Sequence, residues 1–365
     1  MKIAILGTRG VPAKYGGFET FAEELGRRLV KRGHEVHVSC RSNFYSHRLE
    51  DYLGMKLTYT QGVKTKSLET LSHTFNSVKH VLQKPFDIIL LCNIANAPLL
   101  LFSKSLRKKV VLHADGMEWE RNKWNALGKK YFRFAAWLAT KFKTEIISDS
   151  KALQKFYKDK YGRDSNFIAY GAIPTSSSDK TLVRKYGLKP DGYFLQITRF
   201  EPENNPLLSI KAFEKLDTEK KLVLVGGIKY ATAYSEQLYN TKDPRVQFVG
   251  FIYDKNVLRE LRCNAFAYIH GNEVGGTNPA LLEAMSAGCF IVSRDGPFNR
   301  EVLQNAGVYF HKSTEDLRNK LVWTLDHSQE KQDLAKQGKE IILKTYNWDS
   351  VAASYENLFE KIVSS

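Results

Sequence analysis

Residues 271–285, with the sequence GNEVGGTNPALLEAM, contain the residue types of an anion-binding turn. An apolar run ends just before them, and Asn278 and Pro279 then begin an apolar helical pattern. Asn is a favoured N-cap and Pro a favoured first helical residue. At such a turn the free backbone N–H groups and the positive end of the helix face the same point, and Gly275 and Gly276 allow close approach of a ligand. The pattern predicts a bound phosphate group.

A carboxylate follows this turn on the same predicted helix. Glu283 lies five residues after Asn278, which corresponds to about 7–8 Å along a helix that rises about 1.5 Å per residue. This separation suits a diphosphate at the turn and its ribose at Glu283, because a carboxylate accepts hydrogen bonds from both ribose hydroxyls. The alternative is a solvated glutamate on a junction that binds nothing, since glycine motifs also occur without a ligand.

Length and composition indicate a globular protein of two domains. The chain has 365 residues, of which 43% are hydrophobic and 26% charged, enough for two cores of ordinary size. No apolar run has the length of a membrane span, and the apolar segment of MKIAILGTRG is too short for a secretory signal. These features predict a cytoplasmic protein.

The four cysteines predict neither a zinc site nor a redox motif. They stand singly in or beside apolar strand-like segments, without a CxxC spacing or a Cys/His cluster, at Cys40, Cys92, Cys263 and Cys289. Small buried side chains are therefore the expected role.

The net charge of +16 is unevenly distributed. Residues 1–171 contain 30 Lys and Arg against 15 Asp and Glu, whereas residues 172–365 contain 25 against 24. A basic first half attracts an anionic partner, such as nucleic acid, an acidic membrane surface or a diphosphate-bearing molecule. Simple solubility is the alternative.

Strands and helices alternate along both halves of the chain. The first half contains the predicted strands KIAILG, EVHVSC, KLTYT, FDIILLC, KVVLHA, TEIISDS and NFIAYGA, with helices from about Phe18, at 68–82, 97–106, 127–142 and 151–161. The second contains YFLQITRF, KLVLVGG, VQFVGFI, AFAYIH and FIVSRDG, with helices after Pro206, in DKNVLRELR, after Asn278 and in two closing stretches. Alternation of this kind predicts two doubly wound parallel sheets facing a cleft.

The segment AIPTSSSDKT at 172–181 interrupts this pattern. Its proline and serine run predict a boundary between a first domain, residues 1–171, and a second domain, residues 172–345.

The loop after the first strand, GTRGVPAKYGGFE, is not a dinucleotide fingerprint. Gly7 and Gly10 lack the GxGxxG spacing, and the second strand ends in Cys40 and Arg41 rather than in an acid. Gly16 and Gly17 ahead of the helix form either a nest for a phosphate group or a plain crossover.

Three further polar residues end predicted strands, where α/β sheets bind ligands. His113 and Asp115 end KVVLHADG, and Arg199 ends YFLQITR. An arginine at this place can bind a diphosphate through two parallel N–H hydrogen bonds of its guanidinium. The alternatives are a structural histidine and a surface ion pair of Arg199 with Glu201 or Glu203.

Residues 129–143, KKYFRFAAWLATKFK, predict a helix with basic and aromatic side chains. Phe132, Ala136 and Ala139 fall on one stripe. The helix either lies at an anionic membrane surface or packs in the core with a basic outer face.

These motifs together resemble the two-domain GT-B glycosyltransferases of the retaining family-four type, in particular the rhamnosyltransferase-like group of bacterial capsule and cell-wall polysaccharide synthesis. The resemblance covers nearly the whole chain and rests on GTRGVPAKYGGFET, HADGMEWERNKW, IISDSKAL, YGA, RFEPENNP, GGTNPALLEAM and YNWDSVAASY. It implies an acceptor on the first domain, a nucleotide-sugar donor on the second, and a final helix, residues 346–365, that crosses back to the first domain.

The resemblance also assigns site residues. It implies Arg199, His113 and Asp115 as catalytic residues and the donor-binding residues Gly16, Gly17, Glu273, Gly275, Gly276, Thr277, Asn278 and Glu283. Two positions depart from the family pattern: Gly275 replaces a second glutamate, and Asn204 replaces a lysine. We interpret both as adjustment to the donor.

The implied activity is retaining transfer of a hexosyl or deoxyhexosyl group, such as rhamnosyl, from a nucleoside-diphosphate sugar. The acceptor is a glycan or a polyprenyl-diphosphate-linked saccharide, and the protein is peripheral at the inner face of the cell membrane. We expect neither a metal nor a cofactor, since the chain contains no Asp-x-Asp pair, and no nucleic acid partner. The alternatives are a GT-B nucleotide-sugar 2-epimerase and a non-catalytic sugar-nucleotide-binding protein.

Overall fold

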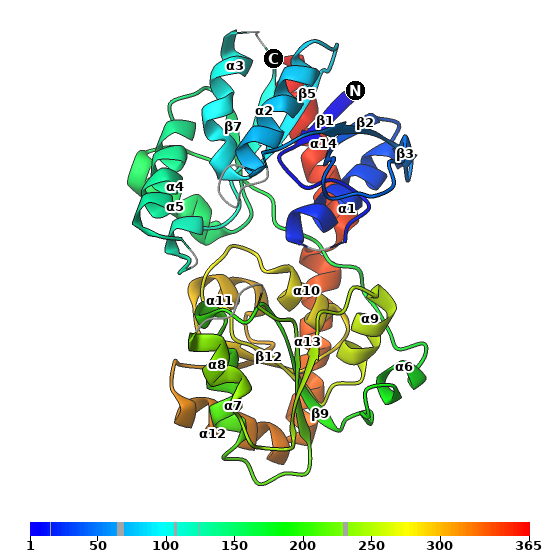
Figure 1. Ribbon diagram of the computed structural model, residues 1–365, viewed down its shortest axis with the longest axis vertical. Helices are drawn as coiled ribbons and strands as arrows, with labels where there is room; N and C mark the ends of the chain where they lie inside the picture. The colour runs from blue at the N-terminus through cyan, green and yellow to red at the C-terminus, as the bar shows by residue number, and fades with distance from the viewer. Residues whose placement is uncertain (15, 64–68, 106–107, 123, 229–232) are drawn as a thin grey trace. The chain divides into compact units, whose positions relative to one another are not determined.

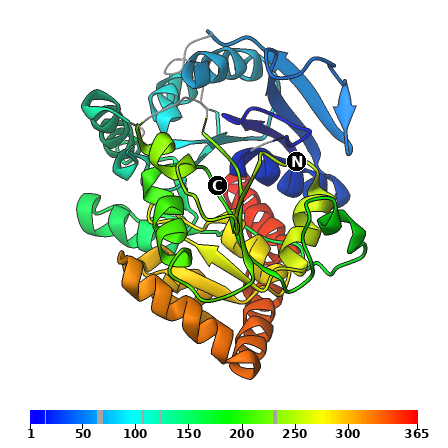
Figure 2. The ribbon, with the colours of Figure 1, turned by 60° about the horizontal axis from the view of Figure 1, so that its bottom comes forward.

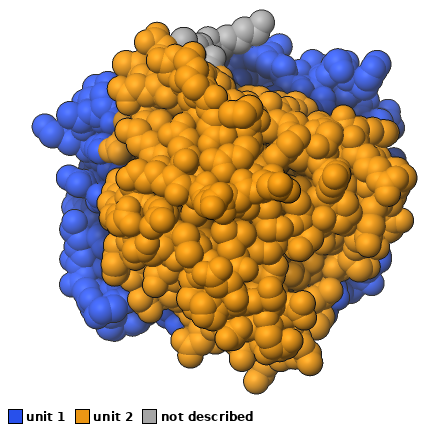
Figure 3. All heavy atoms as spheres, turned by 90° about the horizontal axis from the view of Figure 1, so that it is seen from below, with its two compact units in different colours: residues 1–120, 124–170, 348–365 blue, residues 121–123, 171–347 orange. Residues whose placement is uncertain are grey.

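The computed structural model describes residues 1–14, 16–63, 69–105, 108–122, 124–228 and 233–365. The chain divides into unit 1, residues 1–120, 124–170 and 348–365, and unit 2, residues 121–123 and 171–347. Figure 1 shows the ribbon, and Figure 3 colours the two units separately. Each unit has a mainly parallel sheet with helices on both faces, which confirms the predicted fold class.

The described residues of unit 1 form a sheet with the strand order β3-β4-β2-β1-β5-β6-β7-β8, parallel except for the β3–β4 pair. The strands are β1 (Lys2–Leu6), β2 (Glu35–Arg41), β3 (Asp51–Tyr52), β4 (Met55–Thr60), β5 (Ile88–Cys92), β6 (Val110–His113), β7 (Glu145–Ser148) and β8 (Asn166–Phe167). The helices are α1 (Gly17–Lys31), α2 (Glu69–Leu82), η1 (Ile94–Leu99), α3 (Leu100–Ser105), η2 (Glu118–Glu120), α4 (Ala126–Ala139), α5 (Lys151–Tyr161) and α14 (Trp348–Ser364).

Helices from the two ends of the chain pack together on unit 1. Figure 2 shows α1 in blue beside α14 in red. The ring of Phe21 in α1 lies 5.5 Å from the ring of Tyr355 in α14, and Arg28 Nε donates to Asp349 Oδ1 over 2.7 Å. The core formed by Ala4, Leu6, Ile89 and Leu91 is instead covered by α2, η1, α4 and α5. Phe132, Ala136 and Ala139 of α4 are buried in that core, so the predicted stripe is confirmed as a packing face.

Unit 2 has the strand order β11-β10-β9-β12-β13-β14. Its strands are β9 (Tyr193–Ile197), β10 (Lys221–Val225), β11 (Val246–Gly250), β12 (Ala267–His270), β13 (Ile291–Arg294) and β14 (Gly307–Phe310). Its helices are α6 (Thr181–Arg184), η3 (Pro202–Asn204), α7 (Pro206–Phe213), α8 (Ala233–Tyr239), α9 (Lys255–Cys263), α10 (Pro279–Ser286), α11 (Pro297–Leu303), α12 (Thr314–Asp326) and α13 (Ser328–Thr345).

The structure corrects three local predictions. NFIAYGA forms only the two-residue β8, because this edge strand pairs with β7 alone. The helix predicted at 97–106 begins as the 3₁₀ helix η1, which contains Pro98. The region after FIVSRDG contains α11 and the four-residue β14 before the closing helices. The described residues include no helix that combines the length and the apolarity needed to cross a bilayer.

Candidate functional site

The turn at residues 271–278 follows β12, a central strand of the second sheet that pairs with β9 and β13. The side chain of Asn278 accepts a hydrogen bond from Ala280 N over 3.0 Å, and Pro279 is the first residue of α10. The predicted cap is therefore confirmed. Gly275 has a φ of 156°, which favours glycine, and Thr277 is buried at the helix start. The positive end of α10 thus faces the carboxyl edge of the sheet.

The loop after β9 lies directly against this turn. A Cβ atom at Gly271 would lie 2.2 Å from Asn204 O, so only glycine fits there. Asn205 Nδ2 donates to Gly271 O over 2.8 Å, and Glu273 N donates to Glu203 O over 3.0 Å. The two loops that carry the predicted donor-binding residues are therefore joined by one backbone hydrogen bond and by the side chain of Asn205.

Glu283 lies on α10 and forms an ion pair with Arg262 of α9. The side chain of Arg262 is 9% exposed and that of Glu283 is 40% exposed. Arg262 contacts Glu283 Oε2, and Oε1 has no hydrogen-bond partner among the described residues. The pair holds the carboxylate in place and leaves one oxygen for a ligand.

Arg199 follows β9 and is half-buried. Within the part of the chain that the structure describes, it forms no ion pair with Glu201 or Glu203, the alternative considered above. Asn204, which replaces the lysine of the family pattern, is buried and donates to Arg199 O over 2.9 Å. Asn204 therefore fixes the backbone of Arg199 and supplies no charge.

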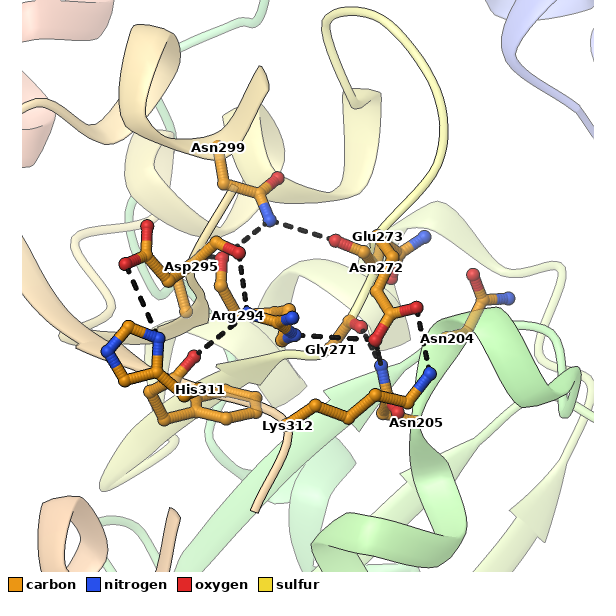
Figure 4. A network of polar contacts seen from close by, with 12 residues as sticks. Asn204, Asn205, Gly271, Asn272, Glu273, Arg294, Asp295, Asn299, His311 and Lys312 are labelled. Carbon is orange, nitrogen blue, oxygen red and sulfur yellow. Dashed lines mark hydrogen bonds and ion pairs between the residues drawn. The ribbon is translucent and has the colours of Figure 1, made fainter. Parts of the chain in front are cut away.

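Glu273 belongs to a polar network at the ends of β9, β12, β13 and β14 (Figure 4). Its carboxylate accepts hydrogen bonds from Asn205 Nδ2 over 3.0 Å, Lys312 Nζ over 3.0 Å and Arg294 Nε over 3.3 Å. Burial raises the pKa of Glu273, but the bonds from Asn205 and Lys312 outweigh burial, so that its pKa lies below the usual value. Both carboxylate oxygens thus bind protein groups and tie the loops together.

His113 ends β6 of unit 1 and is surrounded by aromatic rings. The ring centroids of Phe18, Phe21 and Tyr170 lie 5.4, 5.0 and 5.5 Å from that of His113. Burial lowers the pKa of His113 to about 3, and its Nδ1 accepts a hydrogen bond from Asp115 N over 3.2 Å. The ring is therefore neutral near pH 7 with its proton on Nε2, which suits a hydrogen-bond donor rather than a cation.

Asp115 stands beside His113 in a backbone conformation with a φ of 58°. Tyr170 donates from its hydroxyl to Asp115 Oδ1 over 3.2 Å. Positive φ is uncommon for residues other than glycine, and such residues concentrate at functional sites.

Gly16 and Gly17 lie at the start of α1, and both are exposed. Gly16 has a φ of 122°, and a Cβ there would lie 2.0 Å from Glu19 Oε2. Phe18 of the same helix start contacts His113, so the structure brings the glycine pair and the end of β6 into one region of unit 1.

The structure thus groups the predicted residues within each unit. Arg199, Glu273 and the turn meet in unit 2, with Glu283 farther along α10; His113, Asp115 and the glycine pair meet in unit 1. Sequence reasoning missed Arg262, and no motif pointed to it, because its role depends on α9 packing beside α10.

Both halves of the chain match known protein families. Residues 178–341 match the family described as Glycosyl transferases group 1, and residues 1–173 match a domain of unknown function, DUF1972. The second half of the chain is therefore similar to the glycosyl transferases group 1 family. No curated protein matches the chain at the level of sequence.

Several solved structures share the fold. A sucrose-phosphate synthase from Thermosynechococcus elongatus has a TM-score of 0.86 at 17% identity, covering 100% of this chain and 99% of its own. Anabaena HepE in complex with UDP has a TM-score of 0.77 at 18% identity, covering 99% and 100%. A glycosyltransferase from Rickettsia africae has a TM-score of 0.77 at 15% identity, covering 100% and 99%. These similarities establish the GT-B fold.

Proposed function

We propose that this protein, whose residues 178–341 match the glycosyl transferases group 1 family, transfers a hexosyl or deoxyhexosyl group from a nucleoside-diphosphate sugar to a saccharide acceptor. The observation that carries the proposal is Glu283, held by Arg262 and placed on the helix that begins at the capped turn of Asn278. This arrangement suits a diphosphate at the helix start and its ribose at the carboxylate.

The leaving diphosphate would meet Arg199 and the first backbone N–H groups of α10. These groups stabilise the negative charge that grows on the diphosphate as the bond to the sugar breaks, an effect typically worth about 3–4 kcal/mol per donor. In this mechanism no metal is required. In unit 1, the neutral His113 would donate a hydrogen bond from Nε2, and Asp115 would accept one from a hydroxyl of a substrate.

We further propose that the transfer proceeds with retention, by attack of the acceptor hydroxyl on the same face that the diphosphate leaves. The transferred group would be rhamnosyl or a related deoxyhexosyl, and the acceptor a growing surface polysaccharide or a polyprenyl-diphosphate-linked saccharide. The basic character of residues 1–171 supports an anionic acceptor or membrane surface on the side of unit 1.

A thermal-shift measurement with nucleotides tests the proposal. HepE was crystallised with UDP and with UDP-glucose, so UDP, dTDP, GDP and their sugars form the panel. A ligand that binds only the folded chain raises the melting temperature by mass action. A chain that responds to none of these at millimolar concentration is not a nucleotide-sugar transferase.

The nucleotide sugar that binds then separates the candidate activities. A transferase leaves it intact or hydrolyses it slowly without an acceptor, whereas a 2-epimerase converts it to the epimer. We expect EDTA to leave the transfer rate unchanged, and a rate restored only by a divalent cation would contradict the proposed mechanism.

A further inference from the structure

A group of cations and aromatic rings gathers beyond the ends of three neighbouring strands of unit 1. Two members follow β1, three follow β2, and one lies near the end of β4. We call it the cation–ring cluster; its members are Arg9, Lys14, Phe44, Tyr45, Arg48 and Tyr59. Because these strands are adjacent in the order β4-β2-β1, the cluster lies at the carboxyl edge of the sheet, the edge at which His113 ends β6.

Each cation of the cluster lies over an aromatic ring. The distances from cation to ring centroid are 5.5 Å for Arg9 over Phe44, 6.0 Å for Lys14 over Phe44, 5.2 Å for Lys14 over Tyr45, and 5.7 Å for Arg48 over Tyr59. The rings also contact one another, with centroids 5.5 Å apart for Phe44 and Tyr45 and 6.1 Å apart for Tyr45 and Tyr59. The contacts connect the cluster into one surface.

Aromatic rings hold a cation without cancelling its charge. The arginines of α1 are paired with acids, as in the ion pair of Arg28 with Asp349 over 2.7 Å. Lys14 and Arg48, by contrast, are exposed and form no ion pair with any carboxylate among the described residues. A cation fixed by the face of a ring keeps its full attraction for an external anion.

Two acids at the start of α1 are turned inward. Glu19 and Glu23 are both buried, and they accept hydrogen bonds from Arg9 N over 3.0 Å and Ala13 N over 2.7 Å. Glu19 also lies 4.0 Å from the guanidinium of Arg9. These two carboxylates therefore bind the loop backbone and do not neutralise Lys14. The exposed acids Glu50 and Asp51 follow Arg48 in the chain, and neither forms an ion pair with it among the described residues.

The loop that carries Arg9 and Lys14 is fixed before any ligand binds. Tyr45 donates from its hydroxyl to Pro12 O over 3.1 Å, and Arg41 N donates to Arg9 O over 2.9 Å. Gly10 packs so closely on Cys40 that a Cβ would lie 2.4 Å from Cys40 Sγ. A rigid array of this kind loses little conformational entropy on binding.

On these contacts, and resting on the proposed function, we infer that the cation–ring cluster binds an anionic group of the acceptor. The group is the carboxylate of an acidic sugar or the diphosphate of a lipid-borne saccharide, since both offer paired oxygens to lysine and arginine. A neutral sugar suits the cluster poorly. Its hydroxyls need acceptors as well as donors, whereas the tyrosine hydroxyls already bond to Pro12 O and Leu49 N, and Glu19 and Glu23 are buried.

Binding of three probes to the 365-residue chain tests this inference. The probes are methyl β-D-glucuronide, the neutral methyl β-D-glucoside and farnesyl diphosphate. Ligand-observed NMR measures the binding of each probe. We expect at least one anionic probe to bind about tenfold more tightly than the glucoside, with affinity falling as salt rises. Preference for the glucuronide assigns the acidic sugar, and preference for farnesyl diphosphate assigns the lipid-borne diphosphate.

The double variant Lys14→Gln with Arg48→Gln should bind the preferred anionic probe at least about tenfold more weakly than the unmodified chain. The matched control is Lys31→Gln with Lys79→Gln, which removes two exposed cations elsewhere on unit 1 and should change nothing. Equal binding of charged and neutral probes, or a double variant that binds like the control, overturns the inference.

Nucleotide binding measured on the same variants separates this inference from the proposed function. The double variant should keep the melting-temperature response to UDP or dTDP of the unmodified chain. If nucleotides bind but the variants leave the anionic probes unaffected, only the cluster assignment fails. If no nucleotide binds, the proposed function fails, and the probes still decide whether the cluster binds anions.

Discussion

The buried guanidinium of Arg262 holds the carboxylate of Glu283 across helices α9 and α10. The two residues are 21 positions apart, and their pairing places a fixed acceptor on the helix that the anion-binding turn begins. A carboxylate that is already oriented needs little reorganisation when it accepts hydrogen bonds from a ribose.

Glu283→Gln should weaken nucleoside-diphosphate binding at least about tenfold, because hydrogen bonds to a charged group contribute about 1.5–3 kcal/mol each. The amide keeps the shape of the side chain and one acceptor for Arg262. Titration calorimetry with UDP or dTDP measures the effect, and Glu340→Gln, on the exposed face of α13, is the control. Unchanged affinity would refute the assignment of Glu283 to the ribose.

Glu283→Ala is expected to behave differently. It removes the counter-ion of Arg262, whose side chain is 9% exposed. Breaking a buried pair by deleting one partner costs about 3–5 kcal/mol, less where one partner is partly exposed. We therefore expect that, without ligand, the Glu283→Ala variant melts at a lower temperature than the Glu283→Gln variant. Equal melting temperatures would show that the pair contributes little to stability.

Arg199→Lys should reduce turnover about 10- to 100-fold while changing donor binding less than about threefold. The planar guanidinium matches two phosphate oxygens and an ammonium group does not, and the charge that it meets grows toward the transition state. Steady-state kinetics give kcat, and calorimetry gives the donor affinity. The control is Arg184→Lys on the surface of α6. Equal losses in kcat and in affinity contradict this role.

Much of the fold follows from local sequence signals. The predicted helix at 151–161 matches α5 residue for residue, because Ser150 accepts a hydrogen bond from Leu153 N and Gly162 ends the helix with a φ of 63°. The turn before α10 was visible for the same reason, with a capping Asn followed by Pro. By contrast, β14 has only four residues, too few for a clear strand pattern in the sequence, and it is defined by its pairing with β13.

The candidate site was less visible because its contacts join distant parts of the chain. Glu273 was predicted only as a donor-binding residue, and its bonds with Asn205 and Lys312 from two other strand ends were not predicted. Likewise, nothing near Arg262 in the sequence indicates its partner on α10. Spacing along one element can be read from residues, whereas a partner on another element depends on packing.

Glu260 binds the serine run at residues 176–178, and its carboxylate makes the free energy of unfolding depend on pH. Its buried carboxylate accepts from Ser177 Oγ over 2.6 Å and from Ser178 N over 2.8 Å. Burial raises the pKa of Glu260, but these bonds outweigh burial and lower its pKa from 4.5 to about 2. Since the folded pKa lies below the unfolded one, the stabilisation is complete above about pH 4.5 and is lost as the pH falls toward 2.

Glu260→Gln should therefore cost about 1–3 kcal/mol of unfolding free energy at pH 7. The difference from the unmodified chain should shrink between pH 4.5 and 2, as the native carboxylate becomes protonated. Urea unfolding across this pH range measures it, with Glu340→Gln as an exposed control. A difference that stays constant with pH would argue against the low pKa.

The last prediction concerns the basic helix α4. Its inner face is buried, while Phe134 and Trp137 on its outer side are 49% and 42% exposed, with ring centroids 5.8 Å apart. Lys141 lies over the ring of Trp137 at 5.3 Å. Exposed rings beside cations suit the interface of an anionic membrane.

We expect the protein to bind vesicles that contain anionic lipid at low salt and to dissociate at high salt, because screening weakens the attraction. Changing Lys129, Lys130 and Arg133 together to Gln should weaken binding, since each cation near the surface contributes about 1 kcal/mol. Cosedimentation measures it, and the control replaces Lys180, Lys185 and Lys189, exposed residues of unit 2, with Gln. If the unmodified chain ignores anionic vesicles at low salt, the charge of residues 1–171 serves the acceptor or another anion, and α4 is a core helix with a basic outer face.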